Sequence, residues 1–260
     1  MNNLKTQFSR ARIFGIWLAA GLPMWILGWG VYPLLSSGLG EFDAALMRIK
    51  LLTGGLIWQF VLSMWLLYIE EGNIRLDTIF RRFWLNTPIS QKTRLTQKSL
   101  WWWLIPLLIL VALVELGLGE WLERIWVTLF PFFAQPAGYD VSTLFTPELQ
   151  KQWVGNWSLL GLFTAFAVFN TFLGEEFLFR GVLLPKMQGI FGKWDWLANG
   201  VLFSFYHLHQ PWSILSTLPS GLVFAWSGKH FRSNWFPIIL HSGQSIYFLF
   251  LILGLVLGLA

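Results

Sequence analysis

Residues 157–184 read WSLLGLFTAFAVFNTFLGEEFLFRGVLL, and they are the most informative part of the chain for its fold. The stretch is long and apolar enough to cross a membrane, yet it contains Glu175, Glu176 and Arg180. An ionisable side chain at bilayer depth costs about 2.5–3.5 kcal/mol on insertion scales, so such residues persist mostly where they find partners and serve function. The stretch therefore predicts a membrane helix that carries a polar site.

The composition of the whole chain supports a membrane setting. Of the 260 residues, 55% are hydrophobic and only 12% are charged, which is typical of a polytopic membrane protein and excludes an ordinary soluble domain. The net charge of +5 comes mostly from loop lysines and arginines, so it indicates membrane orientation and no nucleic-acid partner. The absence of cysteine excludes disulfides, a thiol nucleophile and thiolate metal ligands.

Apolar stretches predict an all-α integral membrane bundle of about seven transmembrane helices, within a range of six to eight. The expected spans are residues 13–35, 51–69, 101–118, 160–186, 195–209, 212–228 and 235–258. Residues 120–135 are shorter and more charged, so we expect an interfacial helix there. We divide the chain into N-terminal helices with a basic loop (1–100), a third helix with the interfacial segment (101–153), and a helical core (154–260).

Basic residues predict the orientation of the chain. They gather in four segments: the N-terminus with Lys5, Arg10 and Arg12, the loop 70–100, and the turns 186–193 and 229–232. Seven helices with the N-terminus inside would place all four segments in the cytoplasm. We therefore expect a multi-pass membrane protein with a cytoplasmic N-terminus, in the inner or plasma membrane if the organism is bacterial.

Two histidines in the later apolar segments lie at the depth of the glutamate pair. At about 1.5 Å of rise per residue, Glu175, His207 and His241 each lie about 10–21 Å from the nearest basic turn. The hydrocarbon core is about 30 Å thick, so the three side chains can meet in its middle portion. A carboxylate and two imidazoles gathered there indicate proton-transfer or metal chemistry.

The two glutamates are expected to have different partners. Glu176 and Arg180 are four residues apart on one helix face, where they can form an ion pair. Glu175 points about 100° away from its neighbour, which leaves its carboxylate free. An unpaired carboxylate in an apolar site suits a general base.

Other polar residues in the apolar segments have supporting or structural interpretations. Asn199, Phe203 and His207 are spaced four apart and share one helix face, so the first two are expected to support the site. Glu115 is expected near the outer interface, and His209 at a helix boundary.

Hydrogen-bonding side chains also follow His241 in the last apolar segment. Gln244 and Ser245 lie three and four residues beyond it, on the same side of a helix. Groups of this kind next to an imidazole can stabilise an oxyanion.

These residues resemble three motifs of the CPBP intramembrane proteases. That family includes the type II CAAX prenyl endopeptidases and bacteriocin-processing or immunity proteins. The matching residues are Glu175, Glu176 and Arg180 (Glu-Glu-x-x-x-Arg), Phe203 and His207 (Phe-x-x-x-His), and His241, which begins the last motif. The resemblance covers roughly residues 155–250. The family usually has asparagine four residues after its last histidine, where this chain has Ser245.

The resemblance implies a membrane-embedded endopeptidase that hydrolyses a membrane-associated peptide or protein without a cofactor. It implies that Glu175 and His207 activate the attacking water. It also implies that His241, with Ser245, holds the oxyanion, while the neighbouring Glu-Arg ion pair orders the site.

Three alternatives stay open at this point. Zinc is the nearest, because Glu175, His207 and His241 also make a two-His, one-carboxylate set with an open position for water. The chain has no His-Glu-x-x-His motif, so the residues do not favour zinc. A non-catalytic immunity or scaffold protein would use the same cavity, and Ser245 in place of asparagine motivates that hypothesis. A proton-coupled transporter is weakened by the lack of inverted-repeat symmetry.

Overall fold

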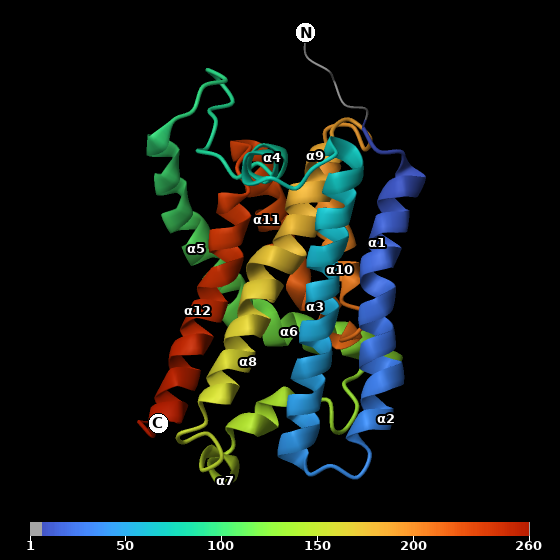
Figure 1. Cartoon of the computed structure of the whole chain (residues 1–260), viewed down its shortest axis with the longest axis vertical. Helices are drawn as coiled ribbons and strands as arrows, with labels where there is room; N and C mark the ends of the chain where they lie inside the picture. The colour runs from blue at the N-terminus through green and yellow to red at the C-terminus, as the bar shows by residue number, and fades with distance from the viewer. Residues whose placement is uncertain (1–6, 260) are drawn as a thin grey trace.

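The chain folds into a bundle of helices (Figure 1). The computed structural model describes residues 7–259, so Lys5 lies outside the described residues. Within residues 7–259 no β-strand is present, and β-type pairing is limited to two isolated bridges. The predicted all-α membrane bundle is confirmed, since five helices in the described part are long and apolar enough to cross a membrane.

The five long helices form the frame of the bundle, and most include short 3-10 or π-helical segments (η). The first is α1 (Arg10–Trp25), η1 (Ile26–Val31) and α2 (Tyr32–Ser36); the second is α3 (Glu41–Glu71); the third is η2 (Lys98–Trp103), α5 (Leu104–Ala112), η3 (Leu113–Leu118) and α6 (Gly119–Leu129). The fourth is α8 (Trp157–Val168), η6 (Phe169–Gly174), η7 (Phe177–Leu183) and α9 (Leu184–Lys186); the fifth is α12 (Trp235–Leu257). The connections contain α4 (Leu76–Arg82), η4 (Pro131–Phe133), η5 (Val141–Phe145) and α7 (Pro147–Gln150).

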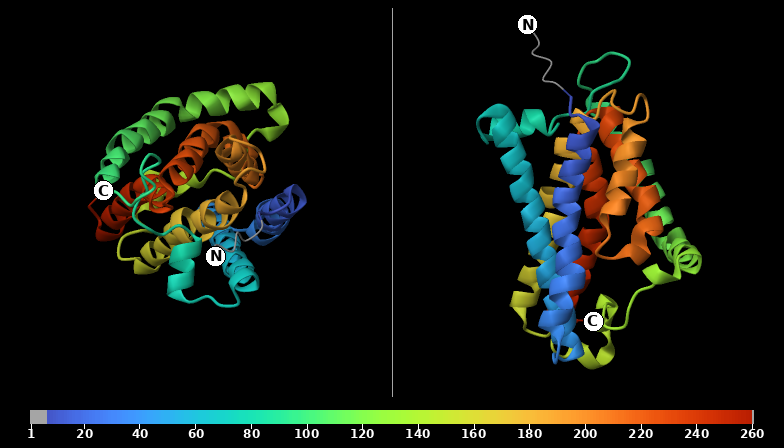
Figure 2. Two further views of the ribbon diagram at one scale, coloured as in Figure 1. Left: turned by 90° about the horizontal axis from the view of Figure 1, so that it is seen from above. Right: turned by 90° about the vertical axis from the view of Figure 1, so that its right-hand side faces the viewer.

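The expected fifth and sixth spans form a hairpin of two shorter helices. α10 (Asp195–Tyr206) has 12 residues and α11 (Ile214–Phe231) has 18. At about 1.5 Å per residue α10 is about 18 Å long, too short to cross a hydrocarbon core of about 30 Å. The two helices start and end at one end of the bundle and turn back within it (Figure 2). The expected count of about seven spans is therefore corrected to five, plus one hairpin, in the described residues.

The hairpin preserves the arrangement of the basic segments. α4, α9 and the described start of the chain lie at one end of the molecule, and the C-terminus lies at the other (Figure 1). The chain returns to the same end after the hairpin, just as it would after two full crossings (Figure 2). With five crossings or with seven, the four basic segments therefore lie on one side. Which compartment that side faces stays a prediction from the charges.

The expected separate interfacial helix at 120–135 is wrong in its boundaries. The structure has one continuous helical path from Lys98 to Leu129, with the π-helical turn η3 joining α5 to α6. Figure 2 shows this path running around the outside of the bundle, and the residues of α6 are all at least partly exposed. The segment is thus the end of the third long helix. It has an apolar face and a charged face because only one of its sides packs against the bundle.

The interior of the bundle is where the polar residues of the long helices gather. Exposed positions along these helices carry large apolar side chains, such as Leu34, Leu116 and Phe250. The buried set includes Glu175, Glu176, Arg180, Asn199 and His207. Polar groups inside and apolar groups outside are the arrangement that a lipid environment favours.

Candidate active site

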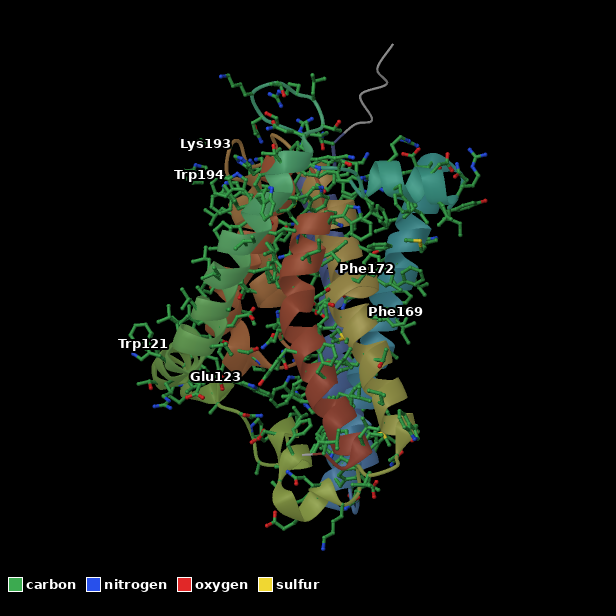
Figure 3. The ribbon with its side chains drawn as sticks, turned by 90° about the vertical axis from the view of Figure 1, so that its left-hand side faces the viewer. Trp121, Glu123, Phe169, Phe172, Lys193 and Trp194 are labelled. Atoms are coloured by element: carbon green, nitrogen blue, oxygen red, sulfur yellow. The ribbon has the colours of Figure 1, made fainter. Side chains whose placement is uncertain are left out.

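The two glutamates lie at the centre of the fourth long helix. Glu175 and Glu176 form a short α-helical turn between the π-helical segments η6 and η7. Phe169 and Phe172, which precede them on η6, lie near the mid-height of the bundle (Figure 3). Both carboxylates are buried, with 2% and 0% exposure. π-helical turns inside α-helices are frequent at functional sites, because they displace the side chains that follow.

Glu176 and Arg180 form the ion pair that their spacing predicts. The Arg180 Nη1 atom donates to Glu176 Oε1 at 3.0 Å, and both side chains are fully buried. Arg180 Nη2 also donates to the carbonyl of Gly221 on α11 at 3.1 Å. The guanidinium lies 4.0 Å above the ring of Phe203, which adds a cation–π contact from α10. Arg180 therefore joins three helices around one carboxylate.

His241 contacts both glutamates. Its Nδ1 atom lies 3.0 Å from Glu176 Oε1, and its Nε2 atom lies 3.9 Å from Glu175 Oε2. The ionised carboxylate of Glu176 only accepts, so the proton of His241 is on Nδ1 and Nε2 faces Glu175. The last motif and the first are thus in direct contact, although 65 residues separate them.

His207 stands at the turn of the hairpin, immediately after the last residue of α10. Its Nδ1 atom lies 3.0 Å from the carbonyl oxygen of Phe203. A carbonyl oxygen cannot donate, so the neutral ring carries its proton on Nδ1 and leaves Nε2 as an acceptor. The ring of Phe203 lies between the imidazoles, with centroids 5.0 Å from His207 and 5.9 Å from His241.

One cavity brings the three expected catalytic side chains together. It has a volume of about 180 Å³ and is lined by Glu175, His207 and His241, with Phe203 among the apolar residues. Glu175 Oε2 is buried and has no hydrogen-bond partner in the described residues. A buried acceptor without a partner costs free energy, and Glu176 Oε2 is in the same state. Glu175 lines the cavity and Glu176 does not, so Glu175 Oε2 is the oxygen placed to take a hydrogen bond from a bound molecule.

Two of the expected supporting residues lie behind the cavity or beside it. Asn199 is fully buried and donates to the carbonyl of Phe179 at 2.8 Å, which ties α10 to the fourth helix. Ser245 is not among the residues that line the cavity, whereas Gln244 is. The rotation of α12 therefore turns Gln244 toward the cavity, and not Ser245.

The cavity also contains residues that the sequence does not single out for it. Glu115, expected near the outer interface, lines the cavity. His209 lies at a helix boundary, as expected, in the turn after α10, and it lines the cavity as well. Asn170 lines it as well, in the helix segment before the glutamates. Tyr206 is fully buried, and its hydroxyl bonds to Glu175 and accepts from Gln59 of α3. No local pattern distinguishes these residues from ordinary helix-packing groups, because their partners come from distant helices.

Two further cavities adjoin the first. One of about 470 Å³ lies between α6, α11 and α12 and shares Glu115, Thr217, Ser220 and Gln244 with it. Trp121 and Glu123 mark this side of the bundle in Figure 3, and Glu123 lines the cavity. The other, of about 290 Å³, lies between α5 and α12 and is mostly apolar. Glu115 and Gln244 line all three cavities, so these two side chains lie between the polar site and the cavities on the flank of the bundle.

Glu175, His207 and His241 are also the candidate ligands of the zinc alternative. Across residues 7–259, no group of three His, Asp or Glu side chains is arranged to hold a metal ion. We therefore derive no step through zinc.

The comparisons with known proteins agree with the residues assembled in the cavity. Residues 156–247 match the family model described as Type II CAAX prenyl endopeptidase Rce1-like. No curated protein and no solved structure matches the chain. The matched segment contains Glu175, His207 and His241, and the long helices make the chain an integral membrane protein. The segment 156–247 is thus similar to the CAAX-type intramembrane proteases, and this match supports a place for the chain in the CPBP family.

Proposed function

We propose that this protein hydrolyses a peptide bond in a membrane-associated peptide or protein, using water activated by Glu175 and His207. One observation carries the proposal. Glu175 Oε2 is buried without a hydrogen-bond partner in the described residues, and it borders the cavity that His207 and His241 also line. The adjacent Glu176 is neutralised by Arg180, so the two carboxylates divide a catalytic role and a structural role.

The general base is Glu175. It takes a proton from water while Nε2 of His207 accepts a hydrogen bond from the same molecule. The resulting hydroxide attacks the carbonyl carbon, and a tetrahedral intermediate forms. Glu175 then returns the proton to the amine nitrogen as the carbon–nitrogen bond breaks. No covalent bond to the protein is needed.

The oxyanion is held by His241. Because Nδ1 of this ring already bonds to Glu176, Nε2 donates only when the ring is an imidazolium. An ionised donor makes a stronger hydrogen bond to an oxyanion than a neutral one does. The amide of Gln244, also on the cavity wall, supplies a second donor.

The experiment is peptide hydrolysis by purified protein in detergent, with a library that includes prenylated and unprenylated membrane peptides. We expect Glu175→Gln to lower the rate by about 10²–10⁴-fold, since that is the usual contribution of a general base. Glu148→Gln is the matched control, because Glu148 is exposed in the distant loop segment α7 and its loss should change nothing.

A strong chelator separates the proposal from the metal alternative. We expect wild-type cleavage to be unaffected by the chelator. Cleavage that is lost with chelator and restored by zinc would move the same residues into a metal mechanism. Equal rates for the wild type and Glu175→Gln would overturn the proposal.

A further inference from the structure

The turn of the α10–α11 hairpin is held by side chains from the first three long helices. The indole Nε1 of Trp29 donates to the carbonyl of Leu208 at 2.8 Å. Arg48 Nη2 donates to the carbonyl of His209 at 3.1 Å. The indole Nε1 of Trp126 donates to the carbonyl of Pro211 at 2.8 Å. We call Trp29, Arg48 and Trp126 the tip clamp.

Arg48 is the unusual member of the tip clamp. It is 2% exposed, and the charged or titratable groups that face it in the described residues are Tyr32, Tyr139 and His209, with no carboxylate among them. Aromatic rings surround its guanidinium: Tyr139 at 4.5 Å, and Tyr32 and Trp212 at 5.5 Å. Burying a cation without a counter-ion is costly, and ring faces offset only part of that cost. Its hydrogen bond to the hairpin turn is therefore the contact that explains its place.

The backbone of the first helix is also shaped to receive the turn. A Cβ atom on Gly28 would lie 3.2 Å from the Cβ and 3.3 Å from the carbonyl oxygen of His209. Gly28 lies in the π-helical segment η1, as does Trp29. The turn thus rests directly on the helix that contributes one of the clamp donors.

The turn that is clamped is the one that carries His207. Its imidazole bonds back to the last turn of α10 through Phe203, so the position of the ring follows the position of the turn. α10 does not cross the bundle, so its inner end lies among the other helices and its position depends on contacts with them. A misplacement of about 1 Å in a catalytic group can cost about a hundredfold in rate.

We propose that the tip clamp positions His207 for catalysis, and that Trp29, Arg48 and Trp126 are positioning residues of the protease reaction. The proposal rests on the proposed function. All three residues lie outside the family-matched segment 156–247, so the N-terminal helices complete a site that the matched segment only partly builds.

Matched indole substitutions test the proposal. Trp29→Phe and Trp126→Phe each remove a hydrogen bond from an indole to a turn carbonyl. Trp58→Phe is the control, because Trp58 Nε1 donates at the same 2.8 Å to the carbonyl of Ala19 and not to a carbonyl of the turn. We expect kcat to fall about tenfold to a hundredfold in the first two variants with little change in KM, and neither to change in the control.

The role of Arg48 is tested by two substitutions, of which one keeps the positive charge and one removes it. Arg48→Met removes the donor and the charge, whereas Arg48→Lys keeps a charge and a donor on a stem of similar length. We expect a large loss of kcat in Arg48→Met and partial rescue in Arg48→Lys. Thermal unfolding in detergent accompanies each assay, so a variant that does not fold is recognised. If an Arg48 variant does not fold, the Trp29→Phe and Trp126→Phe variants decide whether the clamp positions His207.

A double-mutant cycle distinguishes positioning from general stability. If the clamp acts through His207, Trp29→Phe causes no further loss of rate in the His207→Ala background. An equal loss in both backgrounds, or a kcat loss in Trp58→Phe matching that in Trp29→Phe, would overturn the proposal while leaving the proposed function intact.

The rate of the His207→Ala protein can fall below detection, so a second test does not depend on catalysis. Backbone amide exchange of residues 207–213 should accelerate in Trp29→Phe and Trp126→Phe and stay unchanged in Trp58→Phe. Unchanged exchange in both clamp variants would show that the clamp does not hold the turn. Failure of the proposed function itself is separate, since it appears as equal rates in wild type and Glu175→Gln.

Discussion

Glu175 and Glu176 are adjacent, chemically identical and both buried, yet their surroundings differ. Glu176 Oε1 accepts from Arg180 and lies 3.0 Å from His241 Nδ1. Glu175 Oε2 has no hydrogen-bond partner within residues 7–259. A carboxylate paired with a guanidinium is a poor base, whereas Glu175, bonded to the neutral hydroxyl of Tyr206, keeps one oxygen that can take up a proton from bound water. Neighbours, and not residue type, thus separate the two roles.

Gln244 and Ser245 of α12 are also expected to differ in how strongly they stabilise the oxyanion. Gln244 lines the cavity and Ser245 does not. We expect Gln244→Ala to lower kcat by about 10²-fold, the usual effect of removing an oxyanion donor, and Ser245→Ala to leave it nearly unchanged. Steady-state peptide hydrolysis measures both variants. The opposite ranking would show that α12 rotates when substrate binds, which would place Ser245 at the site.

Among the elements, the α10–α11 hairpin depends on close approach of its two helices. A Cβ atom on Gly200 would lie 2.7 Å from Leu222 Cδ2, 3.0 Å from Leu222 Cα and 3.1 Å from the Gly221 carbonyl oxygen. Two of these three are backbone atoms, so the clash is not relieved by a rotamer change. The approach brings Phe203 and the carbonyl of Gly221 to the guanidinium of Arg180.

This packing predicts that one glycine substitution lowers the stability of the protein and that another raises it. Gly200→Ala should destabilise the protein by about 1–3 kcal/mol, because overpacking shifts the backbone. Gly161→Ala on α8 is the control: a Cβ there meets no atom within 4 Å, and alanine is the better helix former by about 1 kcal/mol. In thermal unfolding in detergent, Gly200→Ala should unfold at a lower temperature than the wild type and Gly161→Ala at a higher one. Equal stabilities would mean that the hairpin adjusts without cost.

Across the whole molecule, the basic segments share one end and the hairpin turns back within the bundle. If lysines and arginines mark the cytoplasm, that end faces inside. The hairpin then brings His207 to the site from the cytoplasmic side, whereas the other side chains with a proposed catalytic role lie on the fourth and fifth long helices, which cross the membrane. The two further cavities that Glu115 and Gln244 line lie beside α5, α6 and α12 on the flank of the bundle and not at its basic end.

Single cysteines test this topology directly, because the chain contains none. In intact cells an impermeant thiol reagent should label Ser142→Cys at once and Thr93→Cys only after permeabilisation, since the two positions lie in exposed segments at opposite ends. Ser213→Cys at the hairpin turn should react far more slowly than Ser142→Cys. Rapid labelling of Ser213→Cys from outside would restore two full crossings for α10 and α11.

Properties that depend on neighbours along the chain could be predicted from the sequence alone. Apolar length predicts helices in a membrane, basic loops predict their orientation, and a spacing of four predicts the Glu176–Arg180 pair, which the structure confirms at 3.0 Å. The pair depends on helical geometry alone, which is the same wherever the helix lies. The motif residues are recognisable in the same way, because each motif is local.

Properties that depend on distant helices required the three-dimensional structure. The structure makes α10 and α11 a hairpin, places Gln244 and not Ser245 on the cavity wall, and joins Arg48 to the turn that carries His207. The tilt, rotation and depth of a helix are set by its contacts with other helices. Such contacts join residues that are far apart in sequence, so no periodicity along a single segment can reveal them.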